Sequence, residues 1–217
     1  MTAIKQQPAA LEPRHSAAAR LHSPSAARNK AVIAGLLAER LPQGARVLEI
    51  ACGSGEHGLA AVTARPDLRW TPSDIDAEAR ASADGWASEA GGAIAPALGL
   101  DVTTRGWQAA APAVDAIFCA NMIHIAPWTA CEGLFDGARA LLPEEGLLIL
   151  YGPFLEGEAT APSNLDFDRS LKARDPRWGV RKLADVDACA AERGFTRTER
   201  VETPANNRLI VYRRGAA

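Results

Sequence analysis

The chain is predicted to form an α/β fold, in which a mostly parallel β-sheet carries helices on both faces and ends in an antiparallel hairpin. Short apolar segments alternate with segments of helical periodicity, which indicates parallel strands joined by helices. The last two apolar segments are separated only by residues 203–207, which is too short for a parallel crossover, so a hairpin is expected there. A chain of 217 residues is long enough for one large domain and too short for two.

Order is predicted to begin at Ser23. Residues 1–22 mix alanine, proline, glutamine and charged residues without periodicity, so we expect a disordered tail. Ser23 and Pro24 suit the N-cap and the first position of a helix. Apolar residues at helical spacing continue that helix to about Leu41. The single domain is therefore expected to span residues 23–217.

Strands and helices then alternate to the end of the chain. Strands are predicted at 46–51, 68–72, 96–101, 114–120, 146–151, 195–202 and 208–213. Helices are predicted at 56–65, 77–90, 128–142 and 182–193. Residues 152–181 interrupt the alternation and are rich in proline, aspartate and arginine. Irregular segments of this length are usually either functional or disordered. The aromatic side chains in this one indicate packing, so we predict a lid over the ligand edge of the sheet, at the substrate site.

Composition argues against several classes of function. The chain has 24 Lys and Arg against 26 Asp and Glu, a net charge of -2, which gives no general attraction to nucleic acid or to an anionic membrane. It contains no apolar segment near the roughly 18–20 residues that span a bilayer, and no apolar signal sequence at its start. Four cysteines lack metal-ligand or redox spacing, so we expect reduced thiols, no metal and a cytoplasmic protein. These cysteines are Cys52, Cys119, Cys131 and Cys189.

The strongest functional signal lies at Arg46–Gly58, which reads R-V-L-E-I-A-C-G-S-G-E-H-G. A short apolar strand contains Glu49, and the turn that follows contains Gly53 and Gly55. Glycines let a ligand approach the main chain, and the next helix presents unpaired N–H groups and a partial positive charge. The turn also spells G-x-G-x-x-G, the dinucleotide fingerprint, which is weak on its own.

The acid ahead of the glycines favours a different cofactor. V-L-E-I-A-C-G-S-G resembles the nucleotide loop of class I S-adenosylmethionine (SAM) methyltransferases, and dinucleotide dehydrogenase domains normally lack the terminal hairpin. By this resemblance Glu49, Ala51, Gly53, Gly55 and His57 are expected cofactor contacts. Ala51 occupies a position where glycine is usual, and its methyl group is tolerable if the local φ is negative. A dinucleotide loop and a ligand-free structural turn stay open as alternatives.

Acids follow the next two strands, where ligands bind in open α/β sheets. Asp74 lies about 20 residues after the glycines, the spacing of a carboxylate that accepts hydrogen bonds from ribose hydroxyls. It could instead cap the next helix, a role for which Asp76 is the better candidate. Asp101 resembles the methyltransferase acid that meets the adenine amino group, although aspartate is also a common turn former. Ile75 is then expected to contact the cofactor, and Val102 to pack on the adenine ring.

Three catalytic candidates follow the fourth and fifth strands. Asn121 can offer amide hydrogen bonds to cofactor or substrate. His124 is a candidate general base, because histidine titrates near physiological pH, or else a satisfied loop histidine. Tyr151 ends the fifth predicted strand. Methyl transfer from a sulfonium is intrinsically easy, so positioning of the nucleophile is enough without any base.

Aromatic and basic side chains are the candidate substrate contacts. Together with Tyr151, the rings of Trp128, Phe154 and Trp178 either wall a pocket for the cationic sulfonium, at about 0.5–2 kcal/mol of cation–π attraction, or fill the core. Arg174 and neighbouring arginines either clamp a carboxylate or phosphate of the substrate or form ion pairs that close the lid. The partners in that alternative are Asp166, Asp168 and Asp175.

Several strings go beyond these general features. They are S-P-S-A-A-R-N-K, N-M-I-H-I-A-P-W, Y-G-P-F, A-P-S-N-L-D-F-D, R-D-P-R-W-G-V-R and P-A-N-N-R-L. Together they resemble the domain of unknown function 938 family, also named the methyltransferase-like protein 26 family, from about Ser23 to Arg214. The resemblance implies a Rossmann-like class I methyltransferase fold with a seven-stranded SAM-binding sheet. It also points to Arg28 and Asn29 as contacts, and to Asn206 at the ligand edge of the sheet.

The sequence therefore predicts a SAM-dependent methyltransferase that acts on a small molecule and releases S-adenosylhomocysteine (SAH). A nucleic acid acceptor is not favoured, because we see neither an appended recognition segment nor an excess of basic charge in the sequence. A non-catalytic SAM-binding partner or sensor protein is the main alternative. An NAD(P)-dependent oxidoreductase is a further one.

Overall fold

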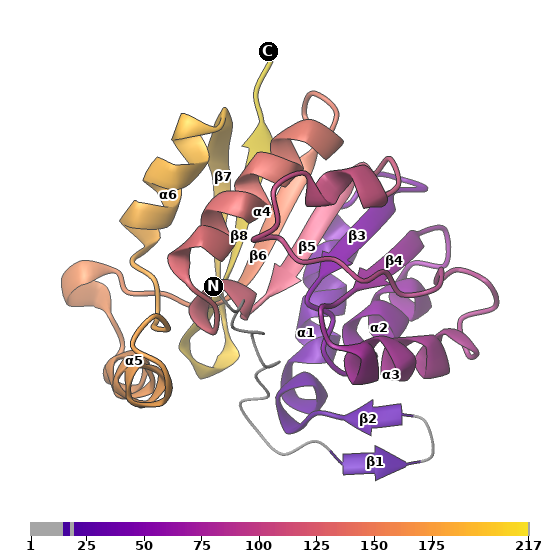
Figure 1. Ribbon diagram of the computed structural model, residues 1–217, viewed down its shortest axis with the longest axis horizontal. Coiled ribbons are helices and arrows are strands. Elements are labelled where there is room, and N and C mark those ends of the chain that lie inside the picture. The colour runs from indigo at the N-terminus through magenta and orange to yellow at the C-terminus, as the bar shows by residue number, and fades with distance from the viewer. Residues whose placement is uncertain (1–14, 18–19, 217) are drawn as a thin grey trace, which may run out of the picture.

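Six strands form the main sheet within residues 15–17 and 20–216, the part of the chain that the computed structural model describes (Figure 1). Their order is β4-β3-β5-β6-β8-β7. These strands are β3 (Arg46–Ile50), β4 (Arg69–Ser73), β5 (Ala116–Ala120), β6 (Leu147–Pro153), β7 (Phe195–Thr203) and β8 (Asn207–Arg214). The helices are α1 (Pro24–Arg40), α2 (Glu56–Ala64), α3 (Ala77–Ala87), α4 (Trp128–Leu141), α5 (Pro162–Arg174) and α6 (Leu183–Glu192). Short 3-10 turns are η1 (Trp107–Ala110), η2 (Met122–His124), η3 (Gly157–Ala159) and η4 (Pro204–Asn206).

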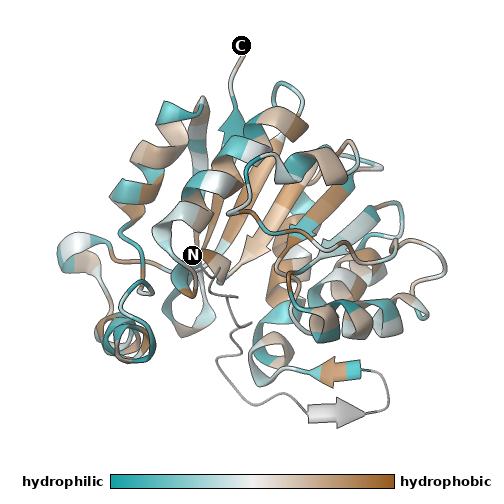
Figure 2. Cartoon of the chain, in the orientation of Figure 1, coloured by the Kyte–Doolittle hydropathy of each residue, from teal (hydrophilic) through white to brown (hydrophobic). Residues whose placement is uncertain are grey.

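Strand directions confirm the predicted α/β class and the terminal hairpin. β4, β3, β5 and β6 pair in parallel, whereas β8 pairs antiparallel to both β6 and β7. Alternate strand residues pack against α4 and α6 on one face and against α1 and α2 on the other (Figure 1). Figure 2 shows the apolar strands enclosed by helices that carry polar residues on their outer sides. The sheet is thus buried on both faces, as parallel sheets are.

The strand predicted at 96–101 is wrong. This part of the chain runs beside β4 but pairs with it only through two isolated bridges, one at Ile94 and one at Leu98. Ile94 and Leu98 are four positions apart, whereas their partners Trp70 and Ser73 are three apart, so one residue is inserted and the register shifts. Pro72, between those partners, also has no N–H to donate. The sheet therefore has six strands instead of seven.

Ordered structure begins before Ser23. β1 (His15–Ala17) and β2 (Arg20–His22) form a short antiparallel ladder. Leu21 is buried, and its N–H donates to Ser82 Oγ of α3 at 2.8 Å. Residues 1–14, 18 and 19 lie outside the described residues, so the expected tail stays a prediction for them. Ser23 is the N-cap of α1 as predicted, since its side chain accepts from the Ala26 N–H.

The segment 152–181 contains a helix that the periodicity did not reveal. β6 continues to Pro153, and α5 then occupies Pro162–Arg174. The inward positions of α5 are Asn164, Asp168 and Leu171, two of which are polar, so no apolar stripe marks the helix in the sequence. Buried polar groups need partners, and both have them: Asn164 donates to the Phe154 carbonyl, and Asp168 accepts from the Val180 N–H. The lid is therefore docked through hydrogen bonds.

The cysteines are four buried free thiols. Among the residues that the structure describes, no group of three or more histidine, cysteine, aspartate or glutamate side chains is arranged to hold a metal ion. Across the same residues, no helix combines the length and the apolar character needed to cross a membrane.

Candidate cofactor and acceptor site

The candidate site lies at the carboxyl ends of the parallel strands. The β7–β8 turn reaches the same edge, because Asn207 pairs with Pro153 at the end of β6. Among the described residues, five that are not glycine have positive φ, and four of them lie at this edge: Ala51, Asn121, Ala205 and Asn206. Backbone strain of this kind concentrates at functional sites. The edge of the sheet at which the sequence predicts the ligand site is therefore also the edge with the strained backbone.

Ala51 has φ of 58°, so the condition of a negative φ, under which its methyl group would be tolerated without strain, is not met. A side chain in this left-handed region costs roughly 1–2 kcal/mol, because Cβ approaches the following carbonyl. The conformation turns the chain sharply after β3. The Cys52 N–H then donates to the Ser73 carbonyl at 2.9 Å and ties the turn to the end of β4.

The glycines of the turn serve packing as well as ligand access. A Cβ at Gly55, where φ is 82°, would lie 2.6 Å from the Ala83 Cα, so its absence lets α3 approach the turn. A Cβ at Gly58 would lie 2.7 Å from Trp70 Nε1. Gly53 is bonded directly to a predicted cofactor residue, since its N–H donates to Asp74 Oδ2 at 3.0 Å.

Asp74 and Ile75 follow β4 and lie beside the glycine turn. Asp74 is 8% exposed, and its two oxygens accept from the Gly53 and Asp76 N–H groups. Ile75 is 43% exposed, although it is a large apolar residue. Asp76 is the N-cap of α3, as predicted, because its side chain accepts from the Glu78 N–H.

Glu49 contacts the protein interior. It is 1% exposed, and its Oε2 accepts from Trp70 Nε1 at 2.9 Å. Its Oε1 lies 3.6 Å from Nδ1 of His57, whose Nε2 lies 2.9 Å from Asn29 Oδ1. The structure thus joins three predicted cofactor residues into one chain of contacts, with Glu49 at its buried end. A direct cofactor contact by Glu49 does not fit this burial.

Asp101 and Val102, at the end of the segment predicted as the third strand, both have partners within the protein. Asp101 Oδ1 accepts from the Thr103 N–H at 2.9 Å and from its hydroxyl at 2.6 Å, which is the turn-forming alternative. Val102 is 7% exposed and packs in the core. An adenine contact by the Val102 side chain therefore does not fit the structure, and the adenine role of Asp101 stays a proposal.

His124 does not fit the role of general base. It is 1% exposed, and its Nδ1 accepts from the Arg181 N–H at 3.2 Å, so the ring nitrogen that could take a proton is already engaged. Nε2 is buried without a hydrogen-bond partner among the described residues. Burial, with the nearby Arg181 charge, lowers the pKa of His124 to about 3. Asn121 lies beside it and is half-buried, at the end of β5.

His124 instead makes stability depend on pH. Its pKa rises from about 3 in the folded chain to 6.5 when unfolded, so below pH 6.5 the unfolded chain binds a proton that the folded chain does not. This contribution is complete above pH 6.5 and falls as the pH drops. Between pH 6.5 and 5 we expect wild type to lose about 2 kcal/mol more unfolding free energy than His124→Asn, which keeps an acceptor for the Arg181 N–H. Urea denaturation measures this difference. His22→Asn, at an exposed histidine, should follow wild type, and parallel curves for wild type and His124→Asn would contradict the prediction.

Two of the expected substrate aromatics are engaged within the fold. Phe154 is 1% exposed and meets the His124 ring edge-on at 5.2 Å, which is the core-filling alternative. The Trp128 ring is covered by the Arg181 guanidinium at 5.6 Å, where a sulfonium was expected. Tyr151 is 2% exposed, and its hydroxyl accepts from Asn207 Nδ2 at 3.3 Å. Its hydroxyl hydrogen is then available to a further acceptor.

Three of the distinctive strings meet at the start of the lid. Asn164 of A-P-S-N donates from Nδ2 to the carbonyls of Phe154, in Y-G-P-F, and Asn206, in P-A-N-N. Asn206 in turn donates to Ser163 Oγ at 2.9 Å. The predicted substrate residue Asn206 thus holds the lid helix against the β7–β8 turn.

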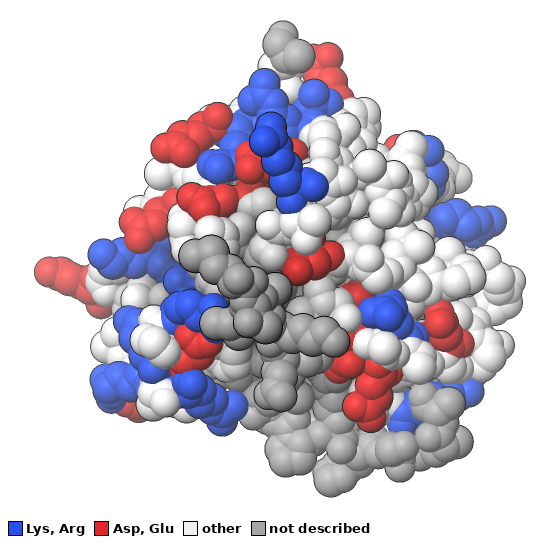
Figure 3. All heavy atoms as spheres, in the orientation of Figure 1, with Lys and Arg blue, Asp and Glu red and all other residues white. Residues whose placement is uncertain are grey.

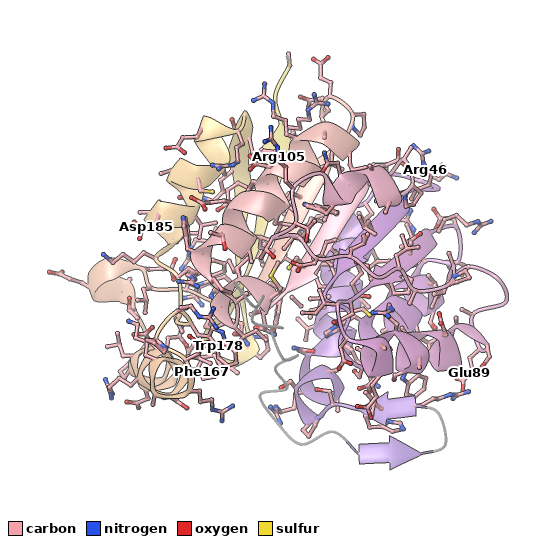
Figure 4. The ribbon with its side chains drawn as sticks, viewed as in Figure 1. Arg46, Glu89, Arg105, Phe167, Trp178 and Asp185 are labelled. Atoms are coloured by element: carbon pink, nitrogen blue, oxygen red, sulfur yellow. The ribbon has the colours of Figure 1, made fainter. Side chains whose placement is uncertain are left out.

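The three aspartates named as possible partners form ion pairs, but with near neighbours in the same segment, so these pairs do not close the lid. Arg169 pairs with Asp166, Lys172 with Asp168 and Arg177 with Asp175. Figure 3 shows the resulting mixture of basic and acidic side chains on the visible face around α5. Arg28 and Arg174 are exposed, and Trp178 is half-buried. Figure 4 shows Trp178 and Phe167 at α5.

Arg181 is a residue that sequence reasoning missed. Its Nε donates to the Ile123 carbonyl at 2.8 Å and its Nη2 to the Ala126 carbonyl at 2.6 Å. It thereby ties the end of the lid to the loop after β5. Arginines were considered only as substrate clamps or partners of lid aspartates, whereas the signal that marks this one is its place in the R-D-P-R-W-G-V-R string.

A cavity of about 320 Å³ lies away from this site. Val62, Pro66, Arg69 and residues 90–93 line it. Arg69 begins β4, so the cavity is at the amino edge of the sheet, opposite the glycine turn. Ligands of open α/β sheets bind at the carboxyl edge, and the candidate site is therefore not this cavity.

Comparison with known proteins adds a family and a fold. A family model described as "Protein of unknown function (DUF938)" matches residues 20–214. An O-methyltransferase family 2 protein from Planctomyces limnophilus, solved with apigenin, aligns at a TM-score of 0.72 and 22% identity over 88% of this chain and 60% of that one. An O-methyltransferase family protein from Burkholderia thailandensis aligns at a TM-score of 0.75 and 15% identity, over 89% of this chain and 57% of that one. Human N-acetylserotonin methyltransferase, solved with SAM, aligns at a TM-score of 0.72 and 16% identity, over 88% of this chain and 53% of that one.

At these identities the likeness shows the fold alone. The chain has the Rossmann-like fold of these methyltransferases, and it spans 53–60% of the length of the three solved chains.

Proposed function

Because the chain belongs to the DUF938 family and has a class I methyltransferase fold, we propose that it binds SAM and transfers a methyl group to a small-molecule acceptor. When bound, SAM supplies an electrophilic methyl group on a sulfonium. The acceptor atom is an oxygen, nitrogen or sulfur. Similar proteins solved with apigenin or with SAM support the cofactor and the size of the acceptor.

The observation that carries the proposal is the arrangement of Asp74 beside the glycine turn. Its carboxylate accepts from the Gly53 and Asp76 N–H groups at the end of β4, and a carboxylate there is the acceptor that suits ribose hydroxyls. Ile75 exposes 43% of its surface next to it, and an adenine ring would cover such an apolar side chain. The adenosine half of the cofactor needs both groups: a carboxylate that accepts from the ribose hydroxyls and an apolar side chain that packs on the adenine.

The acceptor half is proposed to lie between the β5 and β6 ends and the lid. Asn121 and Tyr151 supply an amide and a hydroxyl there, and Trp178, Arg174, Arg28 and Asn206 are the proposed substrate contacts around them. The buried, deprotonated His124 is not needed as a base, because positioning the nucleophile against a sulfonium accounts for the acceleration. The residues of the site then orient the acceptor and exclude water from the methyl group. The proton that the acceptor atom loses on methylation passes to solvent.

Ligand-dependent thermal denaturation tests the cofactor. We expect SAH or SAM to stabilise the protein by about 2.7 kcal/mol at 100 times its Kd, since only the folded state binds it. NAD at the same concentration should have no effect. Preferential stabilisation by NAD would replace the proposal with an oxidoreductase. Stabilisation by SAM without SAH release from any of a panel of small hydroxyl, amine and thiol acceptors would favour a sensor protein.

A further inference from the structure

A chain of polar contacts runs from the interior of the sheet to helix α1. It starts at Glu49, whose Oε2 accepts from Trp70 Nε1 at 2.9 Å. Glu49 is 1% exposed, and Trp70 is equally buried, so this end of the chain is fixed by packing. Glu49 Oε1 faces His57 Nδ1 at 3.6 Å, an electrostatic contact longer than a hydrogen bond. The acid ahead of the glycines is thus directed at a histidine of the first turn of α2.

His57 transmits this constraint to Asn29. The ring is 11% exposed and meets Phe118 edge-on at 6.0 Å, which limits its rotation. Nε2 donates to Asn29 Oδ1 at 2.9 Å. With its oxygen held by the ring, the Asn29 amide turns its Nδ2 donors away from His57. Asn29 is half-buried, so its side chain is not enclosed by the protein.

Helix α1 is itself held against the glycine turn. Glu56, the first residue of α2, accepts from the Ser23 N–H at 2.8 Å, Lys30 Nζ at 2.9 Å and Ser54 Oγ at 2.9 Å. Burial raises the pKa of Glu56, but these hydrogen bonds outweigh it, so the pKa lies below its usual value. Glu56 therefore stays ionised at neutral pH, and Asn29 is presented from a helix whose position is fixed.

The two polar groups beside the turn lie on different sides of β3. Asp74 follows β4, whereas His57 packs on Phe118 of β5, and β3 lies between those strands. Asp74 and Ile75 account for an adenosine group. A ligand that lies across the glycine turn would therefore bring its other end to Asn29.

We propose that Asn29 donates a hydrogen bond to the carboxylate at the amino-acid end of the cofactor, and that His57 and Glu49 are positioning residues for its amide. This inference rests on the proposed function. It gives Glu49 a role that its burial permits, because the carboxylate acts through His57 without touching the ligand. The chain would then distinguish SAM and SAH from adenosyl compounds that lack the amino acid.

The test compares SAH with 5′-methylthioadenosine, which keeps the adenosine and the thioether but has no amino acid. Calorimetric titration of Asn29→Ala should show SAH binding weakened about 10- to 100-fold, as expected for a hydrogen bond to a charged group. Binding of 5′-methylthioadenosine should stay within about twofold of wild type, since that ligand has no carboxylate to lose. Equal weakening of both ligands, or of neither, would overturn the assignment of Asn29.

Two further variants test the positioning roles. His57→Phe keeps the packing on Phe118 but removes both ring nitrogens, and Glu49→Gln keeps an acceptor for Trp70 Nε1. Both should reproduce the selective loss of SAH, by a smaller factor than Asn29→Ala, whereas a purely structural role would weaken both ligands together. Glu39→Gln, at the exposed end of α1, is the matched control and should change neither affinity.

The wild-type titrations test the proposed function and the inference about Asn29 separately. Wild type that binds both ligands, with SAH the tighter, supports the proposed function and the inference. Wild type that binds both equally would overturn the inference and leave the adenosine site standing. Wild type that binds neither would overturn the proposed function itself.

Discussion

Replacement of Asp74 by asparagine is expected to weaken SAH binding about 100-fold. The Asp74 carboxylate accepts from the Gly53 and Asp76 N–H groups, and it is proposed to accept from the ribose hydroxyls as well. An amide replaces one oxygen with a donor, which would face one of these N–H groups or one of the hydroxyls. Loss of a hydrogen bond to a charged group costs about 1.5–3 kcal/mol, and more than one such bond is affected. Calorimetric titration measures the change.

Asp76→Asn is the matched control for this variant. Asp76 caps α3 from two residues away, and asparagine caps helices as well as aspartate does. The control should therefore bind SAH like wild type and have the same unfolding free energy. A folded Asp74→Asn protein whose SAH affinity stayed within about threefold of wild type would remove Asp74 from the cofactor site.

Replacement of Gly55 by alanine is expected to lower the free energy of unfolding by about 2–4 kcal/mol. The φ of 82° places any side chain in the left-handed region, at roughly 1–2 kcal/mol. The new Cβ would also lie 2.6 Å from the Ala83 Cα, which belongs to the backbone of α3 and cannot rotate away. Overpacking of this kind costs about 1–3 kcal/mol. Urea denaturation followed by circular dichroism measures the loss.

Gly35→Ala separates this effect from glycine replacement in general. A Cβ at Gly35, within α1, would meet no atom within 4 Å. Alanine should therefore stabilise the protein by about 0.5–1 kcal/mol, through its better helix propensity. If Gly55→Ala were as stable as wild type, the close approach of α3 to the turn would be incorrect.

Local signals were enough to predict most of the fold. The strand at Arg46–Ile50, the cap at Ser23 and the cap at Asp76 are each encoded within a few residues. The short link 203–207 also required an antiparallel hairpin, because no parallel crossover is so short. Features that depend only on neighbouring residues could be predicted from the sequence.

Features that depend on distant partners could not. Helix α5 hides its inward face behind Asn164 and Asp168, which are acceptable in the interior only because Phe154, Asn206 and Val180 satisfy them. Residues 96–101 look like a strand, but the inserted residue opposite β4 becomes visible only when the two segments are paired.

The candidate site shows the same division. The edge of the sheet and the placement of Asp74 followed from strand order and spacing. The burial of His124 and Glu49 did not, because their surroundings come from the lid and from Trp70. A titratable residue at a strand end is a candidate for chemistry until its neighbours are known, and here those neighbours bury both side chains.

A crystal structure of the protein grown with SAH tests the central claim most directly. We predict SAH across the glycine turn, with its ribose hydroxyls on Asp74, its adenine against Ile75 and its carboxylate on Asn29. The His124 ring should stay outside hydrogen-bond distance of the ligand. SAH bound elsewhere, or the glycine turn free of ligand at a concentration far above that used in the titrations, would contradict the account.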